Sequence, residues 1–228
     1  VAREKLKLKA DSFVITVGAS WLPMMAASFA FRRQIELVDT YRSILKVLKR
    51  LEETNRIEVI IKLHPKSSYT GSFSDEKKYL EVMAKDLGVS VALITDQDLP
   101  DVLAATDLLV CTGLSSVLWD AAAASIPGIR YLQPGYVREN FHQGLLQTKN
   151  PFFNANCAHY VFSENELLEK VQHYLDEKNY IACQKRIETT RKKFKVEDQL
   201  VEEKCERICE WVKSYLTNKA ANAQTDSV

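Results

Sequence analysis

The sequence has almost no excess of either charge, and this narrows the range of partners. Lys and Arg total 31 against 30 for Asp and Glu, so the formal net charge of the 228 residues is +1. A protein that holds nucleic acid mainly through its phosphates has a clear basic excess. We therefore expect no nucleic-acid partner, although a small phosphorylated ligand needs only a local positive field.

Long apolar runs are also missing. The nearest approach is residues 21–31, WLPMMAASFAF, which contain a proline and are shorter than the ~18 residues of a transmembrane helix. This run follows a strand-like segment, which is not the layout of a signal peptide. The chain begins with Val1 and the basic stretch AREKLKLK. We expect residues 1–11 to be a linker or leader within a piece of a longer protein.

Metal-binding patterns are scarce. The cysteine count is odd and no CxxC pair is present. Cys205 and Cys209 are four apart on an expected helix, but no second pair and no nearby histidine completes a metal site. Asp96 and Asp98 follow a strand and are interpreted as the polar start of the next helix. We predict no metal, no cofactor and, from the unpaired thiols, a reducing cytoplasmic location.

What the sequence does contain is an alternation of strand-like and helix-like segments. Repeated β-then-α units of this length predict an α/β fold, a Rossmann-like doubly wound parallel sheet of about six strands with helices on both faces. We expect this domain to span residues 12–217, followed by a disordered tail at 218–228. The expected strands are 13–18, 57–63, 89–94, 108–111, 128–132 and 160–162, and the expected helices are 34–53, 75–87, 98–105, 115–125, 164–177, 179–194 and 196–216.

The first informative strand end is the sequence KLHP at residues 62–65. Doubly wound sheets bind ligands at the carboxyl ends of their strands. His64 ends a strand there, and Pro65 fixes the turn that follows. A histidine in this place can bond a phosphate or sugar oxygen and carry charge near neutral pH. The alternative is a histidine that only caps the strand, and the role of Lys62 stays open.

The second informative strand end is residues 112–116, TGLSS, between a strand and a helix. Gly113 permits a tight turn, and Ser115 is a natural N-cap. Hydroxyl groups and the free amides of a helix start are well suited to phosphate. The alternative is an N-cap without a ligand. Asp120, further along the helix, either reaches a ribose or caps a loop.

These two motifs carry a specific resemblance. The order KLHP and then ATDLLVCTGLSSVLWDAAAASIPGI resembles the donor domain of bacterial surface-polysaccharide transferases, among them CDP-glycerol glycerophosphotransferases and polysialyltransferases. It covers about residues 55–135. It implies the C-terminal half of a two-domain, GT-B-type glycosyltransferase. By resemblance, His64 contacts and protonates the departing phosphate next to Pro65, while Ser115 and Ser116 hold the phosphates.

The resemblance also implies partners. The donor is a nucleotide sugar or a CDP-polyol, and Thr112 and Gly113 belong to its phosphate-binding turn. The acceptor site and the catalytic base belong to an N-terminal acceptor domain or a partner subunit, and the complete protein is compatible with peripheral association at the inner face of the membrane. Three further residues are weaker candidates for ligand binding, with solvated side chains as the alternative: Arg32, Arg138 and His142.

Two other functions remain open. UDP-N-acetylglucosamine 2-epimerases share the strand that ends in His-Pro, but they have a Ser-Gly-Gly turn where this chain has Leu114-Ser115-Ser116. That departure favours a transferase. The second alternative is a non-catalytic Rossmann-like module that binds a partner through residues 196–216 or 21–31.

Overall fold

The computed structural model describes residues 2–18, 29–65, 73–112, 117–132 and 158–193. The chain divides into two compact units, Val1–Thr190 and Arg191–Val228. Beyond residue 193 the second unit lies outside the described residues, and with it the helix expected at 196–216 and the tail. The fold is therefore that of the first unit.

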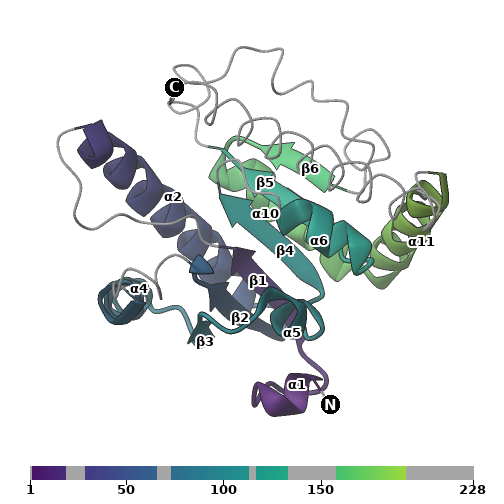
Figure 1. The fold of residues 1–228 in the computed structure, drawn as a ribbon, viewed down its shortest axis with the longest axis horizontal. Helices are drawn as coiled ribbons and strands as arrows, with labels where there is room; N and C mark the ends of the chain where they lie inside the picture. Colours follow the sequence, from purple (N-terminus) through teal and green to yellow (C-terminus); the bar gives the residue numbers. More distant parts are fainter. Residues whose placement is uncertain (1, 19–28, 66–72, 113–116, 133–157, 194–228) are drawn as a thin grey trace, which may run out of the picture. The chain divides into compact units, whose positions relative to one another are not determined.

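The first unit is built on one six-stranded sheet in which every pairing is parallel (Figure 1). The strand order is β3-β2-β1-β4-β5-β6, so the direction of winding reverses between β1 and β4. This is the doubly wound order, and it confirms the predicted Rossmann-like class. The strands are β1 Phe13–Gly18, β2 Ile57–Lys62, β3 Val91–Thr95, β4 Leu108–Thr112, β5 Gly128–Tyr131 and β6 Ala158–Val161.

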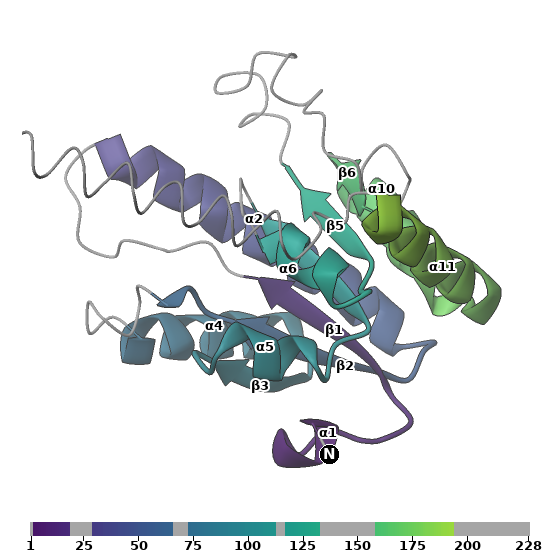
Figure 2. The ribbon, with the colours of Figure 1, turned by 45° about the vertical axis from the view of Figure 1, so that its right-hand side comes forward.

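Helices cover both faces of the sheet (Figure 2). Alternate residues of a strand face opposite sides. In β1, Ile15 and Val17 join the core of one face, and Val14 joins the core of the other. The first face is covered by α2 Phe29–Glu52, α4 Phe73–Leu87, α10 Glu164–Leu175 and α11 Glu177–Lys193, and the second by α1 Ala2–Lys5, α5 Leu99–Leu103 and α6 Val117–Ala123.

Most element boundaries agree with the prediction, and β3 shows why one differs. The strand was expected from Val89 and begins at Val91. Gly88 has a φ of 66°, and the Val89 amide donates to the Ala84 carbonyl at 2.9 Å. Val89 thus closes the end of α4 and cannot pair in the sheet. None of the described helices is both long and apolar enough to cross a membrane.

The segment expected to be a linker or leader packs on the domain. Leu6 and Leu8 are buried against the α5 face. Arg3 donates hydrogen bonds to the carbonyls of Ala10 and Ser12 at 3.1 and 2.9 Å. Residues 2–12 are therefore part of the folded unit. Their pattern LKLK alternates apolar and basic residues, which places the leucines against the sheet and the lysines in solvent.

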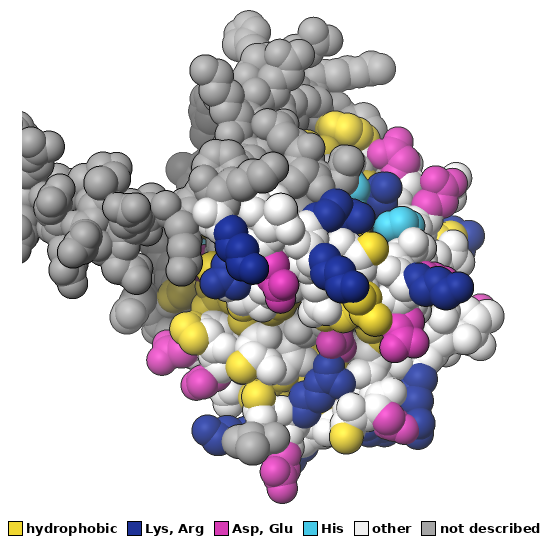
Figure 3. Space-filling view, turned by 90° about the vertical axis from the view of Figure 1, so that its right-hand side faces the viewer, with side chains coloured by type: hydrophobic (Ala, Val, Ile, Leu, Met, Phe, Trp, Pro, Cys, Tyr) yellow, Lys and Arg dark blue, Asp and Glu magenta, His cyan; other side chains and the backbone are white. Residues whose placement is uncertain are grey.

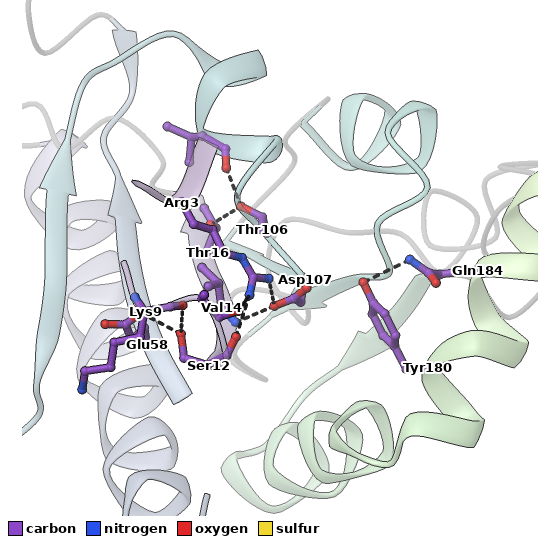
Figure 4. A network of polar contacts seen from close by, with 12 residues as sticks. Arg3, Lys9, Ser12, Val14, Thr16, Glu58, Thr106, Asp107, Tyr180 and Gln184 are labelled. Atoms are coloured by element: carbon purple, nitrogen blue, oxygen red, sulfur yellow. Dashed lines mark hydrogen bonds and ion pairs between the residues drawn. The ribbon is translucent and has the colours of Figure 1, made fainter. Parts of the chain in front are cut away.

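Asp107 joins this segment to the sheet (Figure 4). One carboxylate oxygen accepts from the Arg3 guanidinium at 2.5 Å and from the Val14 amide at 2.7 Å. Next to it, the hydroxyls of Thr16 and Thr106 lie 2.6 Å apart and are buried. These contacts tie α1 and the start of β4 to β1, away from the carboxyl ends of the strands.

We expect Asp107→Ala to lower the free energy of unfolding by about 2 kcal/mol, because it leaves the Val14 amide without its acceptor and the half-buried Arg3 without its ion-pair partner. Urea unfolding measures the change. Asp86→Ala, an exposed change on α4, is the matched control and should shift the midpoint little. Equal effects of the two substitutions would contradict this role of Asp107.

A cluster of rings and cations lies at the β6 edge. Tyr174 is fully buried, and its ring centroid is 5.9 Å from that of His159 and 5.3 Å from that of His173. Figure 3 shows this side of the molecule, where histidine side chains lie beside Lys and Arg side chains. Burial, with the neighbouring charges of Lys170, His173 and Arg186, lowers the pKa of His159 from 6.5 to about 4.

This pKa gives a pH dependence of defined sign. Unfolded His159 binds a proton near pH 6.5, whereas the folded side chain does so only near pH 4, so stability falls as the pH drops through this window. The loss is about 1–3 kcal/mol after allowance for solvent screening. His159→Phe keeps an aromatic ring beside Tyr174 and should flatten the slope of unfolding free energy between pH 6.5 and 4. An unchanged slope would show that His159 is not responsible.

Candidate functional site

The candidate site lies at the carboxyl ends of the strands. The carboxyl ends of the four adjacent strands β3, β2, β1 and β4 are in register. The strand order reverses between β1 and β4. Ligands of doubly wound folds bind beside such a reversal. The residues of this row are Thr95, Lys62, Gly18 and Cys111, on β3, β2, β1 and β4 respectively.

His64 leaves the sheet at this edge. Leu63 is 1% exposed, and its amide donates to the Thr95 carbonyl at 2.8 Å. His64 and Pro65, directly after it, are exposed. The chain thus passes from a buried apolar residue to an exposed histidine within one step, at the edge where a ligand is expected. The roles of His64 in binding and in proton transfer stay predictions.

Of the second motif, the structure describes only the first residue, Thr112. Thr112 is the fully buried last residue of β4 and pairs with Tyr131 of β5. Residues 113–116, which include Gly113, Ser115 and Ser116, lie outside the described residues. Helix α6 begins at Val117, and Asp120 is exposed in its first turn.

Helix α6 was expected at 115–125 and is shorter. It ends at Ala123, and the chain then turns through Ser125, which has a φ of 61°. The Ser125 and Ile126 amides donate back to the carbonyls of Ala122 and Ala121, at 3.1 and 2.8 Å. A left-handed residue after a helix is a common C-terminal stop. The alanine run alone gave no signal for that stop.

Two glycines of the sheet face α6, and one of them, Gly128, is required by the packing of this helix. A Cβ on Gly128 would lie 2.4 Å from Leu118 Cδ2, so this helix packs closely on β5 because residue 128 has no side chain. A Cβ on Gly18 would lie 3.5 Å from Val117 Cγ1, an ordinary contact. Val117 therefore lies over the end of β1, beside the reversal of strand order.

Two buried cations accompany the site. Lys62 is 5% exposed and Arg130, on β5, is 9% exposed. The Lys62 amine donates to the Leu63 carbonyl at 2.7 Å. Burial lowers the pKa of Lys62, while the charges of Asp96 and Asp98 act in the opposite direction. Lys62 had no assigned role in the sequence, although a lysine inside the apolar run IEVIIKL was the available signal.

Arg130 was missed at the sequence level. Its guanidinium carbon lies 5.6 Å from the centroid of the Tyr160 ring, and the guanidinium donates a hydrogen bond to Cys111. Burial raises the pKa of the Cys111 thiol to about 11, although the arginine opposes the shift. Cys111 is therefore a neutral thiol near pH 7 and is unsuited to act as a nucleophile.

The side chains of the three weaker candidates lie outside the described part of the chain. Arg32 belongs to α2, but its side chain is outside the described part, as are Arg138 and His142. Within the described ranges, no group of three or more His, Cys, Asp or Glu side chains could hold a metal ion. The described candidates at the sheet edge are thus His64, Pro65 and Thr112, with Asp120 nearby on α6.

No protein-family model and no curated protein matches the sequence. Solved structures do match. WaaG, a glycosyltransferase of lipopolysaccharide biosynthesis, is 19% identical with a TM-score of 0.54, over 91% of this chain and 50% of WaaG. The C-terminal domain of the glycosyl transferase LpcC from Francisella tularensis is 13% identical with a TM-score of 0.55, over 85% of this chain and 90% of that domain.

A third match is Anabaena HepE in complex with UDP-glucose, 15% identical with a TM-score of 0.55, over 93% of this chain and 51% of HepE. The Listeria monocytogenes protein described as a putative UDP-N-acetylglucosamine 2-epimerase has a TM-score of 0.51 at 12% identity, over 82% of this chain and 40% of that one. The chain spans about half the length of the complete proteins that it matches. Its fold is that of the C-terminal half of GT-B glycosyltransferases.

The fit between α6 and β5 is testable. We expect Gly128→Ala to lower the unfolding free energy by about 1–2 kcal/mol, because Leu118 must move in a packed core. Gly18→Ala is the matched control, since its new methyl group meets only ordinary contacts. Thermal unfolding of both variants measures the difference. A tolerated Gly128→Ala would mean that Leu118 has free space nearby.

Proposed function

We propose that this chain is the donor-binding domain of a glycosyltransferase or polyol-phosphate transferase that uses a nucleotide-activated donor. The observation that carries the proposal is the exposed His64 at the end of β2, in a fold whose ligands bind at this edge. His64 lies one strand away from the reversal of strand order, and Thr112 ends β4 on its other side. A donor phosphate between these two strand ends would be in reach of both motifs.

The chemistry follows from the charge that develops on the leaving group. When the sugar or polyol phosphate is transferred, negative charge builds on the departing nucleotide phosphate. Preorganised donors and cations stabilise such charge most effectively in a partly dehydrated site. We assign His64 to bond and protonate this phosphate, with Ser115 and Ser116 as further donors. The proposed mechanism inverts the reacting centre and uses no metal.

The complete reaction requires more than this domain. The acceptor and the base that activates it are assigned to an N-terminal domain or a partner subunit, since the chain spans about half of WaaG. The matches to WaaG, of lipopolysaccharide biosynthesis, and to HepE with UDP-glucose support a nucleotide-sugar donor and a role in cell-surface polysaccharide synthesis. We propose a cytoplasmic location for this synthesis, compatible with association at the inner face of the membrane.

The epimerase remains the second candidate, because a putative UDP-N-acetylglucosamine 2-epimerase shares the fold. Both candidates place a nucleotide at the same edge. They differ in the turn at residues 113–116, where this chain has Gly113-Leu114-Ser115-Ser116. Incubating the complete protein with UDP-N-acetylglucosamine in the absence of any acceptor separates them, since only an epimerase would form the C2 epimer.

We expect this domain to bind one of CMP, CDP, UDP or GDP in calorimetric titrations, and His64→Ala to weaken that binding about tenfold or more. A hydrogen bond to a charged group has this magnitude. His173→Ala, near the far end of α10, is the control and should bind as the wild type does. Equal binding by wild type and His64→Ala would remove His64 from the site. Absence of binding at millimolar nucleotide would favour the alternative function, that of a non-catalytic module that binds a partner protein.

A further inference from the structure

The direction in which His64 leaves the sheet depends on the two peptide groups that flank Leu63. The first carries the Leu63 amide, which donates to the Thr95 carbonyl of β3 at 2.8 Å. The second carries the Leu63 carbonyl, which accepts from the Lys62 amine at 2.7 Å. This second peptide joins Leu63 to His64. Both peptide planes next to the Leu63 Cα are therefore held, and the backbone of His64 begins from a fixed position.

The donor of this bond, the Lys62 amine, belongs to a buried side chain, which is uncommon for a lysine. The side chain is 5% exposed, and burying an ammonium is costly unless its charge is compensated. The compensation comes from the end of β3, where Asp96 and Asp98 favour the charged form of Lys62. The Thr95 hydroxyl accepts from the Gln97 amide at 3.0 Å, which orders the turn between the two aspartates.

The surroundings of Lys62 separate a structural role from direct phosphate binding. Lys62 stands on the face of the sheet that α5 and α6 cover, since its register partner Cys111, through Gly18, belongs to the α6 core. A side chain with 5% exposure has little surface for a ligand. The amine instead bonds the peptide that immediately precedes the exposed histidine.

We propose that Lys62 is a positioning residue for His64: its amine bonds the Leu63 carbonyl and so sets the direction of the imidazole toward the donor phosphate. The negative charges of Asp96 and Asp98 keep the Lys62 amine in the charged form that donates this bond. The positioning of His64 is a property of the ligand-free chain. Its consequence for the donor rests on the proposed function. The lysine acts through the histidine, so its effect on binding should disappear when His64 is absent.

The test uses Lys62→Met, which keeps an unbranched apolar stem and removes the amine. Lys62→Arg keeps a charged donor, and Lys78→Met on α4 is the control for an exposed lysine. The first measurement is made without any ligand. In ¹H–¹⁵N spectra of the ligand-free protein, we expect Lys62→Met to shift the His64 amide and imidazole signals and to speed amide exchange at residues 63–64, and Lys62→Arg to restore them in part.

The second measurement is a double-mutant cycle on nucleotide binding, with the nucleotide that the wild type binds. We expect Lys62→Met to weaken binding about tenfold and to add nothing in the His64→Ala background. Independent effects that multiply would overturn the proposal and indicate direct contact with the ligand. Unchanged His64 signals in Lys62→Met would overturn it as well. If the wild type binds no nucleotide, the proposed function fails, while the spectra still decide the positioning role.

Discussion

The pairing of β1 with a parallel neighbour on each side is the constraint on which the rest of the fold depends. Its partners are β2 and β4, and both ladders place their carboxyl ends beside Gly18. The chain reaches β2 and β3 in one direction and must return across β1 to begin β4. The helices that follow β1 and β4, α2 and α6, consequently lie on opposite faces of the sheet, and the ends of β1 and β4 flank the reversal of strand order.

Charge compensation is the second requirement of this edge. Burying Lys62 beside the site concentrates positive charge where a phosphate is expected, but an isolated buried ammonium would lose its proton. The aspartates at the end of β3 counter this tendency. The buried charge of Arg130 is stabilised differently, since its guanidinium lies over the face of Tyr160 and donates a hydrogen bond to the sulfur of Cys111. The sheet thus carries two cations without exposing either one widely to water.

Sequence patterns predicted the sheet well because its strands are buried on both faces and read as continuous apolar runs. They also located His64 at a strand end, since Pro65 interrupts the run. They failed where a contact joins distant residues. Nothing local to Arg3 reveals its bond to Asp107, so residues 2–8 read as a basic leader. Likewise, periodicity cannot show that the Lys62 amine bonds the carbonyl of the next residue, because a pattern of apolar and polar residues carries no information on side-chain conformation.

The fully buried thiol of Cys111 has a consequence for experiments on this molecule. It lies at the centre of the sheet, and its neutral form reacts slowly with alkylating reagents. Modification therefore requires β4 to separate from the helix that covers it. When the reagent reacts with the opened state faster than the strands reclose, the rate at which Cys111 is labelled would report the rate at which the central strands open in the native state.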